Sequence, residues 1–97
     1  MKALFISFNQ AYYDTIIAIM DRNNIKGFTY WDTVQGRGSE KGEPHYGSHA
    51  WPTLNSAILA IVEDRQVANF LDLLHALDRQ TEAQGLRAFV WNIEQTI

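Results

Sequence analysis

The segment Val34-Gln35-Gly36-Arg37-Gly38-Ser39-Glu40-Lys41-Gly42 divides the chain into two halves that are both rich in strand-like runs. Three of its nine residues are glycines, which adopt positive φ and let a ligand approach the main chain closely. Arg37 and Lys41 add cationic donors suited to phosphate or carboxylate. Four of the six glycines and both prolines lie between Gly36 and Pro52, which predicts one long loop. Long loops inside compact domains are usually functional.

On either side of this loop, the apolar pattern predicts strands over residues 2–8, 28–35, 53–62 and 86–93. Asn9 and Asp64 are the expected caps of two intervening helices, and Asn23-Asn24, Gly27 and Gly85 mark turns. The apolar positions that recur every three or four residues are Tyr13, Ile16, Ile17 and Met20 in the first helix, and Val67, Phe70, Leu71, Leu74 and Leu77 in the second. This β-α-β-β-α-β order predicts an α+β, ferredoxin-like fold. Its antiparallel four-stranded sheet carries both helices on one face, with the long loop between strands 2 and 3.

Length and composition limit the function further. We expect a single domain over residues 1–97, because a chain of this length builds one core. A net charge of −3 gives no general attraction to nucleic acid. The absence of cysteine excludes disulfides, thiolate zinc sites and cysteine nucleophiles. The apolar run at residues 1–6 is too short for a signal peptide or a membrane span, so we expect a cytoplasmic protein.

Both faces of the predicted sheet are apolar. In the third strand Ile58, Ala60 and Val62 face one way and Ala57, Leu59 and Ile61 the other. Phe89, Trp91 and Ile93 likewise oppose Ala88 and Val90 in the fourth strand. Two helices cover only one face, so we expect the other face to be buried against further copies of the chain. The alternative is a monomer with scattered exposed apolar residues, which are common singly.

The residues resemble a known family, the PII signalling proteins. Lys26-Gly27-Phe28-Thr29 and the segment Val34–Gly42 are similar to the family's second strand and the entry to its T-loop. Gly85-Leu86-Arg87-Ala88-Phe89-Val90-Trp91-Asn92-Ile93-Glu94 is similar to the family's last strand, and the order of elements agrees over nearly the whole chain. The resemblance implies a homotrimer with inward-facing sheets, clefts between subunits that bind ATP or ADP, and a T-loop that docks on a transporter or enzyme.

By position, Gly36, Gly38, Lys41 and Gly42 match the family's loop entry, and with Arg37 and Glu40 they are the expected ligand-binding residues. Glu40 replaces the family glutamine that helps bind 2-oxoglutarate, and its carboxylate would repel an anionic oxoacid. The family's second phosphate loop is missing, since Thr81-Glu82-Ala83-Gln84-Gly85-Leu86-Arg87 stands there. The C-terminal basic tail is absent too, and the family's modified tyrosine would fall near Trp51 and Pro52. The chain therefore resembles a divergent member with an open effector.

The segment Glu43–Pro52 is unlike the family's usual loop. His45 and His49, near Glu40, offer ligands for zinc, nickel or copper(II), but Pro44, Gly47 and Pro52 argue against the helix that would align them. The alternative role of both histidines is structural or in contact with a protein partner. Tyr46 and Trp51 either anchor a partner or ligand ring, or, for Trp51, pin the base of the loop.

No catalytic constellation is evident, because nothing orients a loop histidine against Ser39 or Ser48. Acylphosphatase shares the fold and a Val-Gln-Gly sequence, but its phosphate loop follows the first strand, so we exclude it. We therefore predict a non-enzymatic sensor and adaptor that binds an adenine nucleotide or a divalent metal between subunits. Its loop from Ser39 to Trp51 would then regulate a partner protein such as a membrane transporter. The alternative is a trimeric metal-handling protein of the CutA type, and no cofactor is indicated.

Overall fold

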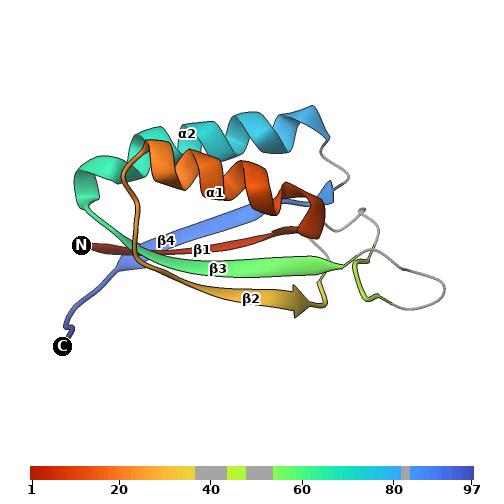
Figure 1. Cartoon of the computed structure of the whole chain (residues 1–97). Helices are drawn as coiled ribbons and strands as arrows, with labels where there is room; N and C mark the ends of the chain where they lie inside the picture. The colour runs from red at the N-terminus through yellow and green to blue at the C-terminus, as the bar shows by residue number, and fades with distance from the viewer. Residues whose placement is uncertain (37–43, 48–53, 82–83) are drawn as a thin grey trace.

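The computed structural model describes residues 1–36, 44–47, 54–81 and 84–97. Along the chain these form β1 (Lys2–Asn9), the 3₁₀ turn η1 (Gln10–Tyr12), α1 (Tyr13–Arg22), β2 (Phe28–Val34), β3 (Asn55–Val62), α2 (Asp64–Gln80) and β4 (Arg87–Asn92). The ferredoxin-like order expected from the sequence is confirmed (Figure 1). Each predicted strand boundary lies within about two residues of the observed one, as expected for pattern-based boundaries.

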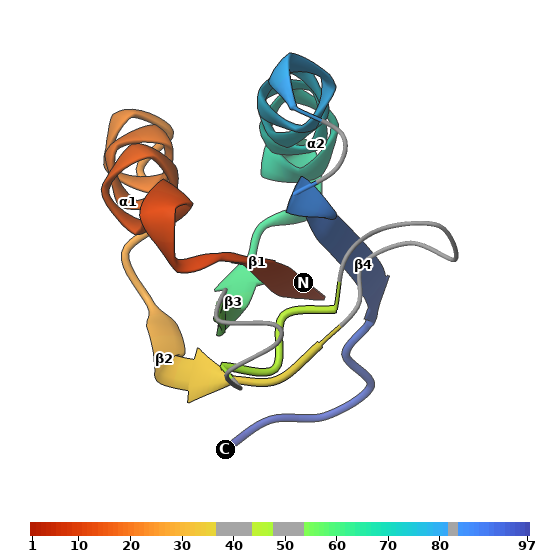
Figure 2. The same ribbon diagram turned by 90° about the vertical axis from the view of Figure 1, so that its right-hand side faces the viewer.

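The four strands form one antiparallel sheet in the order β2-β3-β1-β4. Both helices lie on the same face of this sheet (Figures 1 and 2). The two central strands, β1 and β3, are far apart in sequence. Their register brings Ser7 opposite Ala57 and Asn9 opposite Asn55. The polar ends of both strands therefore meet where the long loop begins.

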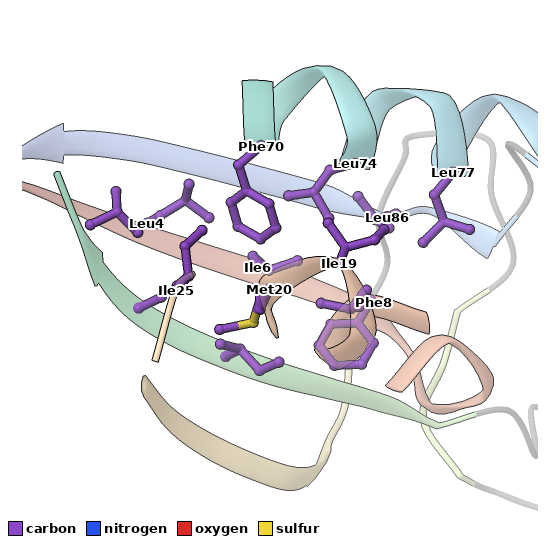
Figure 3. Packing of buried hydrophobic residues seen from close by; sticks show 14 residues of the cluster. Leu4, Ile6, Phe8, Ile19, Met20, Ile25, Phe70, Leu74, Leu77 and Leu86 are labelled. Atoms are coloured by element: carbon purple, nitrogen blue, oxygen red, sulfur yellow. The ribbon is translucent and has the colours of Figure 1, made fainter. Parts of the chain in front are cut away.

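The hydrophobic core lies between the sheet and the helices (Figure 3). Alternate residues of each central strand point into it because successive strand side chains face opposite ways. α1 and α2 contribute the apolar positions that recur every three or four residues. Burying each large apolar side chain stabilises the fold by about 1.5–3 kcal/mol. The core residues are Leu4, Ile6, Phe8, Ile16, Ile19, Met20, Ile25, Ile58, Ala60, Val62, Phe70, Leu74, Leu77 and Leu86.

The helix ends differ in detail from the sequence prediction. Asn9 accepts a hydrogen bond from the Ala11 amide at 2.9 Å, but it caps η1, so α1 begins only at Tyr13. Asp64 is the first residue of α2, and Glu63 is its N-cap, so the expected cap was wrong by one residue. Gln66 explains the shift, because its Oε1 accepts the Glu63 amide hydrogen at 2.8 Å.

β2 contains a bulge near its end. Trp31 pairs with Ala57 and Val34 pairs with Asn55, so β2 has one more residue than β3 between these pairs. The carbonyl of Asp32 in the bulge accepts hydrogen bonds from Ser56 Oγ at 2.6 Å and from Gln10 Nε2 at 2.9 Å. Side chains thus replace the ladder bonds that the bulge interrupts.

The face of the sheet away from the helices, here called the open face, is rich in apolar side chains. One row across all four strands runs Thr29–Leu59–Phe5–Phe89. Phe5 and Trp31 lie with ring centroids 6.4 Å apart, and Phe89 and Trp91 are 57% and 50% exposed. The two-sided apolar pattern read from the sequence is therefore present. Among the helices of the described residues, none is long and apolar enough to cross a membrane.

Candidate effector site at the base of the long loop

A short two-stranded neck closes the base of the long loop. Gly36 and His45 exchange both backbone hydrogen bonds, at 3.0 and 2.6 Å, and Tyr46 forms a second bridge with Leu54. Gln35 Nε2 donates to the Tyr46 carbonyl at 2.8 Å, which ties the two sides of the neck together. The chain that leaves β2 and the chain that returns to β3 are therefore fixed to each other before the loop begins.

His45 is buried beneath the sheet at the neck. It is 2% exposed, and its Nδ1 lies 2.5 Å from Oδ1 of Asn55, which is 1% exposed. Asn55 Nδ2 donates in turn to Ser7 Oγ at 3.4 Å. The register places Ser7 and Asn55 on the open face, and Figure 2 shows the segment 44–47 on that side of the sheet. This hydrogen-bonded trio links the loop to the two central strands.

Glycine is required where the neck passes closest to other residues. A Cβ on Gly36 would lie 2.9 Å from Asn55 Nδ2, a side chain held by two partners. Gly47 has φ of +66°, and a Cβ there would lie 2.2 Å from a methyl carbon of Leu54. The close approach of Gly36 to Asn55 holds the backbone of the neck against β3. The close approach of Gly47 to Leu54 restricts the conformation of the chain at Gly47.

A second polar group supports the end of β2 from the helix side. The Tyr30 hydroxyl donates to Asp32 Oδ1 at 3.0 Å and lies 3.4 Å from Ser56 Oγ, while its ring packs on Tyr13 with centroids 4.5 Å apart. Partial burial raises the pKa of the Tyr30 phenol above its ordinary value of 10.0, and the Asp32 carboxylate acts in the same direction. Tyr30 therefore remains a neutral donor at physiological pH.

Of the predicted site residues, Gly36, His45 and Tyr46 lie in the described part of the chain, and the structure brings all three together in the neck. Arg37, Gly38, Glu40, Lys41, Gly42, His49 and Trp51 lie outside the described residues. Tyr46 is 37% exposed, whereas His45 presents almost no surface. Within residues 1–36, 44–47, 54–81 and 84–97, no three His, Cys, Asp or Glu side chains are grouped to hold a metal.

Sequence reasoning assigned no role to Ser7 or Asn55. The available signal was a polar residue, Ser7 or Asn55, next to an apolar run in its strand, since a buried polar side chain such as Asn55 needs a partner.

Comparison with known proteins identifies the family to which this chain belongs. The family model described as nitrogen regulatory protein P-II matches residues 1–97. The chain belongs to the P-II family. No curated protein matches it.

Solved structures of PII-like proteins share the fold. CPII from Thiomonas intermedia K12, bound to ADP and bicarbonate, is 25% identical with a TM-score of 0.75, over 95% of this chain and 84% of that one. The apo form of CPII is 22% identical with a TM-score of 0.72, over 95% and 87%. A PII-like signalling protein from Thermus thermophilus is 20% identical with a TM-score of 0.66, over 95% and 85%. The resemblance seen in the sequence is thereby confirmed.

Proposed function

We propose that this P-II family member is a non-enzymatic cytoplasmic sensor that binds an adenine nucleotide at the base of its long loop. Residues Gly36, Arg37, Gly38, Glu40, Lys41 and Gly42 form the binding segment in this proposal, in a cleft between copies of the chain. The observation that carries it is the shared fold with CPII, which was solved with ADP and bicarbonate bound.

The position of the neck supports this site. Gly36 is the first glycine of the glycine-rich segment, and it is fixed against His45 and Asn55. Arg37 follows Gly36 directly, Lys41 lies five residues after Gly36, and both supply charged donors for a phosphate or bicarbonate. A ligand held by these residues acts directly beside the hydrogen bonds that set how the loop leaves the sheet. Ligand binding that favours one loop arrangement over another then shifts the loop population.

The long loop is proposed to transmit ligand binding to a partner protein. Tyr46, His49 and Trp51 would contact a partner protein, such as a transporter, because aromatic side chains in loops make strong interface anchors. His45 would act from the interior, since its burial fits a role in positioning the loop.

Isothermal titration of the native oligomer tests the proposal directly. ADP, ATP and AMP are each titrated with and without bicarbonate, against wild type, Arg37→Ala and Lys41→Ala. We expect nucleotide binding to weaken about tenfold or more in each variant, because each removes a charged hydrogen bond. Arg22→Ala is the matched control, since Arg22 is exposed at the far end of α1.

The proposal would be contradicted if neither ADP, ATP nor AMP bound. It would also be contradicted if Arg37→Ala and Lys41→Ala bound the nucleotide with the affinity of wild type. Zinc, nickel and copper(II) are titrated in parallel. Tight metal binding that His49→Ala abolishes, without nucleotide binding, would favour the CutA-type alternative instead.

A further inference from the structure

A separate pocket of about 300 Å³ lies between α2 and the start of β4. Figures 1 and 2 show α2 over this end of β4, on the helix side of the sheet. From α2 it is lined by Leu71, Leu74, His75 and Asp78, whose spacing places them on one face of the helix. From β4 and the residue before it come Leu86, Arg87 and Ala88. None of these residues belongs to the loop neck, so the pocket is distinct from the site proposed above.

One residue that lines this pocket has a buried polar atom without a partner. Asp78 Oδ1 accepts no hydrogen bond, and it is the one such side-chain atom found in the described part of the chain. The nearest cation is Arg87, whose Nη1 lies 3.7 Å from Asp78 Oδ2, too far for a hydrogen bond. The same Nη1 donates instead to the Leu86 carbonyl at 2.7 Å. A buried carboxylate oxygen without a donor is unfavourable, so the site favours a ligand that donates to it.

The charges of the pocket define what such a ligand carries. Asp78 and Arg87 form a long ion pair, with Nη1 3.7 Å from Oδ2, and a ligand cation beside Asp78 with a ligand anion beside the further N–H groups of Arg87 would extend it. The two side chains are adjacent, so the complementary ligand bears both charges close together. The remaining walls are Leu71, Leu74, Leu86 and Ala88, which favour an apolar body. The volume lies at the small end of ligand pockets, which suits a single small molecule.

We propose that the α2–β4 pocket binds a free α-amino acid with an apolar side chain. Its ammonium group donates to the Asp78 carboxylate, with the imidazole of His75 as a second acceptor. Its carboxylate accepts from Arg87, and its side chain packs against the leucines. An α-amino acid fits because one carbon joins its two charged groups. The proposal goes beyond nucleotide sensing and does not depend on it.

Titration of wild-type protein with leucine and two matched analogues, without nucleotide, tests this chemistry. Leucinamide lacks the carboxylate, and N-acetylleucine lacks the ammonium group. We expect leucine to bind and each analogue to bind about tenfold more weakly or worse, because each leaves one charged group unpaired. The test does not require any variant to fold.

Two variants then assign the groups. Asp78→Asn preserves side-chain size and Arg87→Gln keeps a polar side chain without the charge, and each is expected to weaken leucine binding about tenfold or more. The matched controls are Asp72→Asn and Arg79→Gln, both exposed on α2 and outside the pocket lining, which should leave the affinity unchanged. Circular dichroism and thermal melting establish that each variant is folded.

Three results would overturn the proposal. The first is no binding of leucine, valine, methionine or phenylalanine up to about 10 mM, where even a weak specific site would be detected. The second is equal binding of leucine and leucinamide. The third is unchanged leucine affinity in a folded Asp78→Asn variant.

Discussion

At the scale of single residues, the neck depends on a few polar atoms that lie in an apolar sheet. Asn55 is buried between His45 and Ser7, so both ends of its amide are engaged. Gly36 passes so close to this amide that no side chain fits between them. The glycine is therefore needed for space, whether or not it contacts a ligand.

Gly36→Ala is expected to destabilise the protein by about 1–3 kcal/mol, because the added methyl overpacks a site whose neighbour cannot move away freely. Urea unfolding followed by circular dichroism measures the free energy of unfolding. The control is Gly27→Ala, where a Cβ meets nothing within 4 Å, and its stability should equal or slightly exceed that of wild type. Equal stability of both variants would contradict the close approach seen at Asn55.

At the scale of elements, α2 is fixed at its start by a side chain of its own first turn. Gln66 Oε1 accepts the Glu63 amide hydrogen, and Gln66 Nε2 donates to the Asn23 carbonyl at 3.1 Å, just after α1. One residue thus caps α2 and ties the end of α1 to it.

Gln66→Ala is expected to lower the free energy of unfolding by about 0.5–2 kcal/mol, because it leaves the Glu63 amide and the Asn23 carbonyl without this partner. Thermal and urea unfolding measure the change. Arg65→Ala is the control, since Arg65 is exposed in the same turn and its removal should change stability by less than about 0.5 kcal/mol. A Gln66→Ala variant as stable as this control would show that the cap contributes nothing.

The elements themselves were predictable because their signals are local. The apolar run of β1 and the spacing of Phe70, Leu74 and Leu77 in α2 are visible within windows of a few residues. The exact cap of α2 was missed, because an acidic residue stands at both positions and Gln66 decides between them. The contacts of His45 were not predictable, since they depend on the return of the chain to Gly36 and on the pairing of β2 with β3, which brings Val34 opposite Asn55.

At the scale of the whole molecule, the open face is an apolar surface that a single chain leaves exposed to solvent. Trp31, Phe89 and Trp91 expose large rings on a sheet whose opposite face is fully packed. The proposed homotrimer would bury these rings, because contiguous apolar surface favours association. The C-terminus also lies on this side of the sheet, away from the helices (Figure 2).

Phe89→Glu is expected to shift the protein from three copies to one, because it places a charge in the centre of the proposed interface. Analytical ultracentrifugation at micromolar concentration gives the mass, and circular dichroism shows that the fold remains. Leu73→Glu is the matched control, since Leu73 is an exposed apolar residue on α2, away from the sheet, and it should leave the mass unchanged. A wild-type protein that sediments as a single chain would refute the homotrimer.

The bulge in β2 carries a consequence for how this chain tolerates changes of length. Because of the extra residue between Trp31 and Val34, Val34 pairs with Asn55, and its side chain faces the same side of the sheet as that of Trp31. Deleting one residue there would restore an unbroken ladder and keep Val34 opposite Asn55, because the bulge already holds one residue more than the pairing needs. Loss of one residue between Trp31 and Val34 should therefore leave the facing of the neck unchanged, whereas loss of one residue between Val34 and Gly36 would turn Gly36 away from its present side.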